Sequence, residues 1–130
     1  MKQSKIMDEP DREIVFLSDR EIESSDREWY EHPEWKGIRL KDLLTGKDTG
    51  NKFSYHLVHI EKNCEIPKHL HEKEWELNRM IKGKGLFIFD NKEITLSAGQ
   101  TFATPPGVSH AVSSYDSEMS LLALFIPVSD

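Results

Sequence analysis

Alternating hydrophobic and polar positions run through most of the chain and predict an all-β fold. The segment at 53–60, FSYHLVHI, alternates and is rich in residues that favour strands. The segment at 85–96 fits two strands joined by Asp90-Asn91, a dipeptide that tolerates positive φ and predicts a hairpin. The run at 119–128, MSLLALFIPV, is typical of a strand buried on both faces. Short strands with Gly and Pro turns between them predict a small antiparallel β-sandwich or barrel.

The first 36 residues have a different pattern, and we predict an N-terminal arm at 1–36 followed by a barrel at 37–130. The polar residues 1–13 are expected to be loosely ordered, and IVFL at 14–17 fits a short strand. The acidic stretch 18–37 carries three aromatic residues, which favour docking onto the barrel over disorder. These aromatic residues are Trp29, Tyr30 and Trp35.

Composition narrows the class of protein. A chain of 130 residues is the usual size of one domain. The net charge of -6, without a long basic run, argues against nucleic-acid binding, and no basic amphipathic stretch or long apolar run indicates a membrane. One cysteine, Cys64, cannot form an internal disulfide, which fits a reducing compartment. We therefore expect a cytoplasmic protein.

Histidines and carboxylates gather in KHLHEKEWELNRMIKG, residues 68–83. His69 and His71 are two positions apart, so an extended strand points both imidazoles to one face. Glu76 follows shortly after, and His110 comes after a Pro-Gly turn. Taken singly, each fits polar surface, but three imidazoles and a carboxylate together suit Mn, Fe, Co, Ni, Cu or Zn better than Ca or Mg.

Two motifs in order resemble those of the cupin superfamily. The first, G-x5-H-x-H-x3–4-E-x6-G, matches from Asn63 to Gly83, and the second, G-x5-P-x-G-x2-H-x3-N, matches from Gly99 to Ser114. Asn63 replaces a glycine, and asparagine is the residue that best tolerates the left-handed backbone in its place. Ser114 replaces an asparagine at a position that does not hold metal in the family.

The resemblance implies a small single-domain cupin, a double-stranded β-helix with one divalent transition metal (Fe, Mn, Ni or Zn) in its pocket. The implied ligands are His69, His71, Glu76 and His110. Glu76 has the required spacing; Glu74 is the competing carboxylate, and with Glu72 it fits a solvated turn. Strand alternation directs further side chains to the same interior, and the residues predicted to contact a substrate are Asn78, Met80, Phe102, Val112 and His59. The alternation in 53–60 does not show which face of this strand points inward, so His56 and His59 remain alternative candidates for a contact with the metal ligands or the substrate.

The resemblance permits a metal-dependent enzyme acting on a small molecule, as a dioxygenase, isomerase, decarboxylase or lyase. The alternatives are a non-catalytic small-ligand-binding or sensing module and a metal-free structural relative. Trp75, Leu77 and Ile81 share the outward strand face, which is too apolar for solvent and needs a cover. Either the arm or a second subunit could supply it, and a homodimer is expected because single-domain cupins commonly form one.

Overall fold

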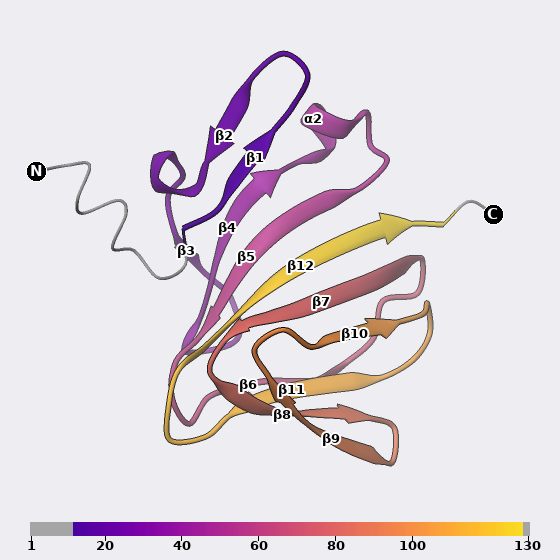
Figure 1. The fold of residues 1–130 in the computed structure, drawn as a ribbon. Helices are drawn as coiled ribbons and strands as arrows, with labels where there is room; N and C mark the ends of the chain where they lie inside the picture. Colours follow the sequence, from indigo (N-terminus) through magenta and orange to yellow (C-terminus); the bar gives the residue numbers. More distant parts are fainter. Residues whose placement is uncertain (1–11, 129–130) are drawn as a thin grey trace, which may run out of the picture.

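Two facing β-sheets form the body of the protein in a computed structural model that describes residues 12–128 (Figure 1). The predicted all-β fold is confirmed, while most of the segment expected to be loosely ordered, 1–13, lies outside the described residues. In chain order the elements are β1 (Ile14–Phe16), β2 (Glu21–Glu23), the short 3-10 helix η1 (Ser24–Asp26), β3 (Tyr30–Glu31), β4 (Ile38–Leu44), α2 (Gly46–Thr49), β5 (Ser54–Ile60), β6 (Glu65–His69), β7 (Glu74–Lys82), β8 (Lys84–Phe89), β9 (Lys92–Ser97), β10 (Thr101–Thr104), β11 (His110–Ser114) and β12 (Met119–Pro127).

The larger sheet has six strands in the order β10-β7-β12-β5-β4-β3, and the smaller has four in the order β6-β11-β8-β9. The chain passes repeatedly from one sheet to the other, so residues distant in sequence become neighbours. The predicted hairpin is β8–β9, in which Phe89 pairs with Lys92 and Asp90 takes a φ of 42°. The described residues contain no helix long and apolar enough to cross a membrane.

The main hydrophobic core fills the space between the sheets. Phe87 and Met80 are fully buried there, and the Phe87 ring stacks on Phe102 with 3.6 Å between ring centroids. The apolar run of β12 contributes to both faces of its sheet: Leu121 packs in the main core and Leu122 in a second cluster on the outer face. Only the first part of this strand is buried on both faces, because Ile126 near its end is exposed.

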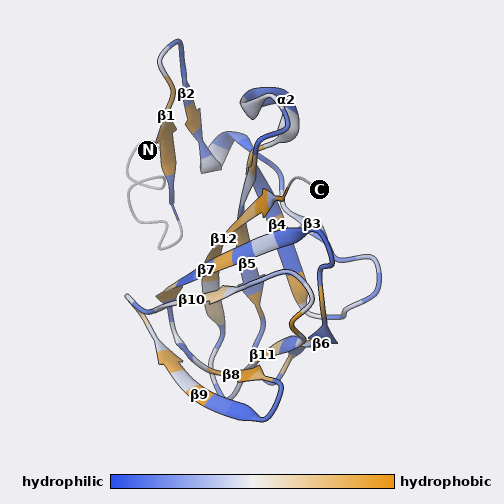
Figure 2. Ribbon diagram, turned by 90° about the vertical axis from the view of Figure 1, so that its right-hand side faces the viewer, coloured by the Kyte–Doolittle hydropathy of each residue, from blue (hydrophilic) through white to orange (hydrophobic). Residues whose placement is uncertain are grey.

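The N-terminal arm docks on the outer face of the larger sheet. Val15 and Trp29 pack against an outer cluster that includes Leu57, and hydrophobic residues mark β1 in Figure 2. Buried Lys41 donates a hydrogen bond from Nζ to the carbonyl of Ser24 (2.8 Å) and lies 4.9 Å from the centroid of the Trp29 ring. Docking of the arm aromatics is thus confirmed for Trp29.

The arm covers only part of that outer face. Ile81 packs against the outer cluster that the arm covers, whereas Trp75 and Leu77 remain 43% and 37% exposed. The predicted cover is therefore present over Ile81, and Trp75 and Leu77 are left uncovered by the described part of the arm.

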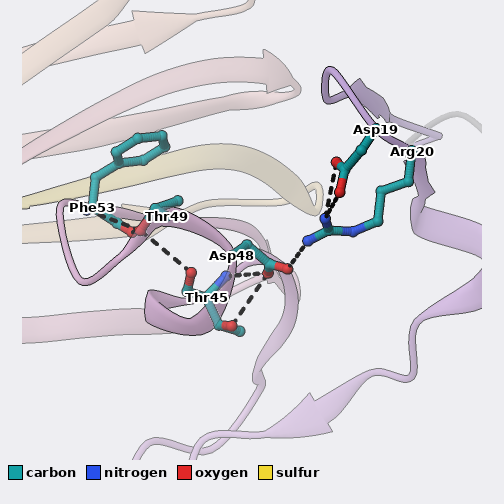
Figure 3. A network of polar contacts seen from close by, with 6 residues as sticks. All are labelled: Asp19, Arg20, Thr45, Asp48, Thr49 and Phe53. Carbon is teal, nitrogen blue, oxygen red and sulfur yellow. Dashed lines mark hydrogen bonds and ion pairs between the residues drawn. The ribbon is translucent and has the colours of Figure 1, made fainter.

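A polar clamp fixes the tip of the β1–β2 hairpin to helix α2 (Figure 3). Arg20 forms ion pairs with Asp19 (3.1 Å) and with Asp48 of α2. The Asp48 carboxylate also accepts a hydrogen bond from the backbone N–H of Thr45 (2.9 Å), at the N-terminus of the helix. These bonds lower the pKa of Asp48, first through the Thr45 backbone and then through Arg20, so the clamp holds an ionised carboxylate.

Gly83 and Gly99 provide a matched test of what the turns require. Both have positive φ, +88° and +94°, but a Cβ on Gly83 would lie 2.4 Å from the Glu118 carbonyl oxygen, whereas one on Gly99 would meet nothing within 4 Å. Gly99→Ala should lower the free energy of unfolding by about 1–2 kcal/mol through backbone strain alone. Gly83→Ala should lower the free energy of unfolding clearly more, because the backbone between β7 and β8 must also move away from Glu118. Urea unfolding of the two variants measures this, and equal losses would contradict it.

Candidate metal centre

Four polar side chains from three strands and one loop meet between the two sheets. His69 ends β6 and pairs with His110 at the start of β11, while His71 follows β6 and Glu76 lies in β7. Each offers one ligand atom, and these four atoms lie within 4.8 Å of one another. Residues up to 41 positions apart in the sequence thus converge, because antiparallel pairing places the β6 and β11 ends side by side.

Glu76 stands at the centre of this cluster and is only 8% exposed. Its Oε1 lies 3.0 Å from Nε2 of His110 and 3.1 Å from Nε2 of His71. Its Oε2 accepts a hydrogen bond of 2.7 Å from Nδ2 of Asn78. Burial acts to raise the pKa of Glu76, but the hydrogen bonds from His110, His71 and Asn78 outweigh it and hold this pKa far below its ordinary value. The carboxylate therefore stays ionised inside the protein.

Backbone carbonyl groups near Nδ1 orient two of the imidazole rings. Nδ1 of His69 donates to the carbonyl of Pro67 (2.8 Å), and Nδ1 of His110 lies 3.4 Å from the carbonyl of Val108. The bond to Pro67 places the proton of His69 on Nδ1 and leaves its Nε2 to bind a metal ion. Nε2 of His110 donates to Glu76 instead, and a metal ion bound there would replace that proton. Burial lowers the pKa of His69 and so favours the neutral, ligating form, whereas the hydrogen bond to Glu76 raises the pKa of His71.

This donor set fits a divalent transition metal. Three imidazole nitrogens and one ionised carboxylate oxygen are ligands preferred by Fe, Mn, Ni and Zn, while Ca and Mg require mostly oxygen. Glu74, the competing carboxylate, has its Oε1 3.7 Å from Nδ1 of His71, on the side of the ring away from Glu76. Its position suits orienting His71 rather than joining the cluster.

A cavity of about 150 Å³ opens beside the cluster. Asn78 and Val112 line it, but Met80 and Phe102 lie in the core and do not. The residues that line it are His32, Trp35, Ile38, Leu40, Val58, Ile66, His69, His71, Glu76, Asn78, Val112, Leu121, Ala123 and Phe125.

The two strand histidines of 53–60 take opposite faces. His59 lies on the outer face, 6.1 Å from Trp29 between ring centroids, and is thereby separated from the cavity and from any ligand in it. His56 points inward but does not line the cavity, and both of its ring nitrogens are engaged, by Asp42 (2.8 Å) and Ser54 (2.9 Å). Tyr30 of the arm also donates to Asp42 (2.6 Å). His56 thus belongs to a polar network with Asp42, Ser54 and Tyr30 that does not line the cavity.

Sequence reasoning missed the contribution of the arm to the cavity. His32 follows β3 and donates its backbone N–H to the carbonyl of Ile38, which brings it over the sheet edge. Its ring stacks on Trp35 with 4.0 Å between centroids, and Trp35 lies 5.0 Å from His69. Phe125 stands on another side, 5.3 Å from His71. The aromatic content of HPEW was the only available signal, since this segment has no periodicity.

Residues 56–127 match the model of a protein family described as a cupin domain. Among solved structures, a predicted oxalate decarboxylase from Thermotoga maritima is 24% identical with a TM-score of 0.75, over 82% of this chain and 98% of that one. KdgF from a Halomonas species is 19% identical with a TM-score of 0.69, over 89% and 96%. The polyketide cyclase RemF from Streptomyces resistomycificus is 18% identical with a TM-score of 0.69, over 79% and 75%. Among curated proteins, none matches the sequence significantly.

Removal of cluster imidazoles tests metal binding directly. Added Fe, Mn, Ni or Zn should raise the melting temperature of the wild-type protein, because an ion that binds only the folded state stabilises it. His69→Ala and His110→Ala should lose that increase. Glu72→Gln, which removes an exposed carboxylate three residues after His69, is the matched control and should keep it. A melting temperature that rises equally in all four proteins would place the metal elsewhere.

Asn78 should tune the affinity of the centre without being a ligand. Asn78→Ala removes the hydrogen bond that orients the Glu76 carboxylate. The loss of such an outer partner typically weakens metal binding about 10–100-fold. Competition titration with a chromophoric chelator measures the dissociation constant of Zn²⁺. An unchanged constant would show that Asn78 plays no part in orienting Glu76.

Proposed function

The chain belongs to the cupin domain family, and on that premise we propose that it is a metal-dependent enzyme acting on a small molecule. The observation that carries the proposal is the convergence of His69, His71, Glu76 and His110 beside a mostly apolar cavity. These four residues would hold one divalent transition metal, Fe, Mn, Ni or Zn. A metal bound there would supply Lewis-acid or oxygen-activating chemistry at a protected surface.

The protein's own residues prepare the cavity for such chemistry. Glu76 brings a fixed negative charge that offsets the charge of the ion, and Asn78 holds its second oxygen in place. The aliphatic and aromatic walls exclude water, which strengthens electrostatic interactions within the cavity. Phe125 packs against His71 and limits the motion of that ring.

The type of reaction is a further part of the proposal, and the fold alone does not determine it. The similar structures include a predicted oxalate decarboxylase, a polyketide cyclase and DMSP lyases. Their activities differ from one another, so the proposal keeps decarboxylase, isomerase, lyase and dioxygenase types of reaction open, because one fold hosts many chemistries.

A non-catalytic binding or sensing module is the second candidate function. Apart from the proposed metal ligands, the polar side-chain groups of the described residues that line the cavity are His32, Asn78 and the indole N–H of Trp35. Asn78 cannot transfer protons, so an acid–base reaction would depend on His32 or on groups of the substrate. A sensor needs no such group.

Turnover by metal-loaded protein separates the two candidates. We expect that small acids, phenols or thiols presented to protein loaded in turn with Fe, Mn, Ni and Zn will include one that is consumed, as followed by oxygen uptake and by mass spectrometry of products. His110→Ala should lose this turnover by at least about a hundredfold, because a reaction that depends on the metal site cannot proceed without it. Binding without any consumption would favour the sensing module.

A further inference from the structure

The arm supplies one wall of the cavity. Trp35 is held between His32, on which it stacks with rings 2° from parallel, and His69, which its ring approaches at 51°. This wall is attached to the sheet edge by β3, in which Tyr30 pairs with Leu40, and Leu40 itself lines the cavity. The wall is therefore built into the fold and stands beside a proposed metal ligand.

Two backbone hydrogen bonds define the tautomer of the His32 ring. Its Nδ1 accepts hydrogen bonds from the backbone N–H groups of Glu34 (3.1 Å) and Trp35 (3.2 Å). An imidazole that accepts at Nδ1 carries its proton on Nε2. Within the described part of the chain, no partner takes this Nε2–H. His32 thus brings one unused hydrogen-bond donor to a cavity whose other polar lining residues lie mostly at the metal cluster.

The other walls define what can fill the space. Seven aliphatic residues line the cavity, and none of its described lining residues is lysine or arginine. A carboxylate placed away from the metal would therefore be buried without a counter-charge, which is strongly unfavourable. A volume of about 150 Å³ resembles that of an apolar protein cavity that binds benzene, so it admits an apolar group of about six carbon atoms.

We infer that the pocket takes a small monocarboxylate or comparable mono-anion with an apolar tail and a single hydrogen-bond acceptor for His32, and that the arm residues His32 and Trp35 select it. The acidic group faces the metal cluster, and the tail lies among the aliphatic walls. This inference rests on the proposed function, because it assigns the acidic head to the metal. It excludes ligands with a second, distant carboxylate.

Calorimetric titration of Zn²⁺-loaded protein with a matched series of acids tests the class. From acetate through propanoate and butanoate to pentanoate, the affinity should rise about fourfold for each added methylene. Glutarate has the same number of carbon atoms as pentanoate and should bind at least about tenfold more weakly, because its second carboxylate loses its hydration. The heat of binding, rather than turnover, is the readout.

Two arm variants test the selection. Trp35→Ala should weaken pentanoate binding at least about fivefold by removing apolar contact, whereas Trp75→Ala, at an exposed tryptophan outside the cavity, should change it less than twofold. His32→Phe keeps a ring to stack on Trp35 but removes the donor. In the wild type, 4-oxopentanoate should bind about fivefold more tightly than pentanoate, and this preference should disappear in His32→Phe.

The outcomes separate this inference from the proposed function. Affinity that does not change with chain length, or glutarate binding as tightly as pentanoate, overturns the inferred ligand class even if Zn²⁺ is taken up normally. Equal effects of Trp35→Ala and Trp75→Ala overturn the role of the arm. Failure of the wild type to take up any of Zn²⁺, Fe, Mn and Ni overturns the proposed function itself, and the inference with it. The wild-type acid series decides the class even if an arm variant does not fold.

Discussion

The buried charge of Glu76 is the constraint on which the arrangement around it depends. An ionised carboxylate in an apolar interior is stable only when other groups replace its lost hydration. Here one oxygen faces the imidazoles of His71 and His110, and the other accepts from Asn78. The demand for partners explains why histidines from separate segments must meet at this point. The same partners form a cluster of donors that suits a transition metal.

Backbone pairing gives this charge a rigid support. Glu76 lies in β7 between two hydrogen-bonded neighbours, with Thr104 of β10 opposite on one side and Phe125 of β12 on the other. The cluster is therefore not carried on mobile loops alone. Only His71 follows a strand rather than lying in one, and its ring is held between Glu76 and Phe125.

The sequence predicted much of the fold and of the cluster because both follow from short-range rules. Asn78 and Val112 each stand two positions from a proposed ligand on the same strand, so alternation alone directs them inward. Alternation does not give depth, and Phe102 lies against Phe87 in the core instead of at the cavity. It also does not say which face of an isolated strand is inward, and His59 lies on the outer face under the arm.

The arm's part in the cavity could not be predicted in the same way. His32 and Trp35 lie in an irregular segment, and their position depends on the pairing of β3 with β4, which joins only two residues of each strand. No periodic pattern within the segment specifies that contact. The contacts that tie the neighbouring part of the arm to the sheet, through Trp29 and buried Lys41, also lie outside this segment.

The pairing of β3 with β4 also gives the cavity a wall from outside the stretch that carries the four clustered side chains. The four clustered side chains lie within the stretch that matches the family, 56–127, whereas the wall that faces them precedes it. Substitutions in a few irregular residues near position 32 can therefore reshape the pocket while the sheets and the cluster persist. In this architecture, relatives can diverge in the short segment that forms one wall of the cavity while they keep the four clustered side chains.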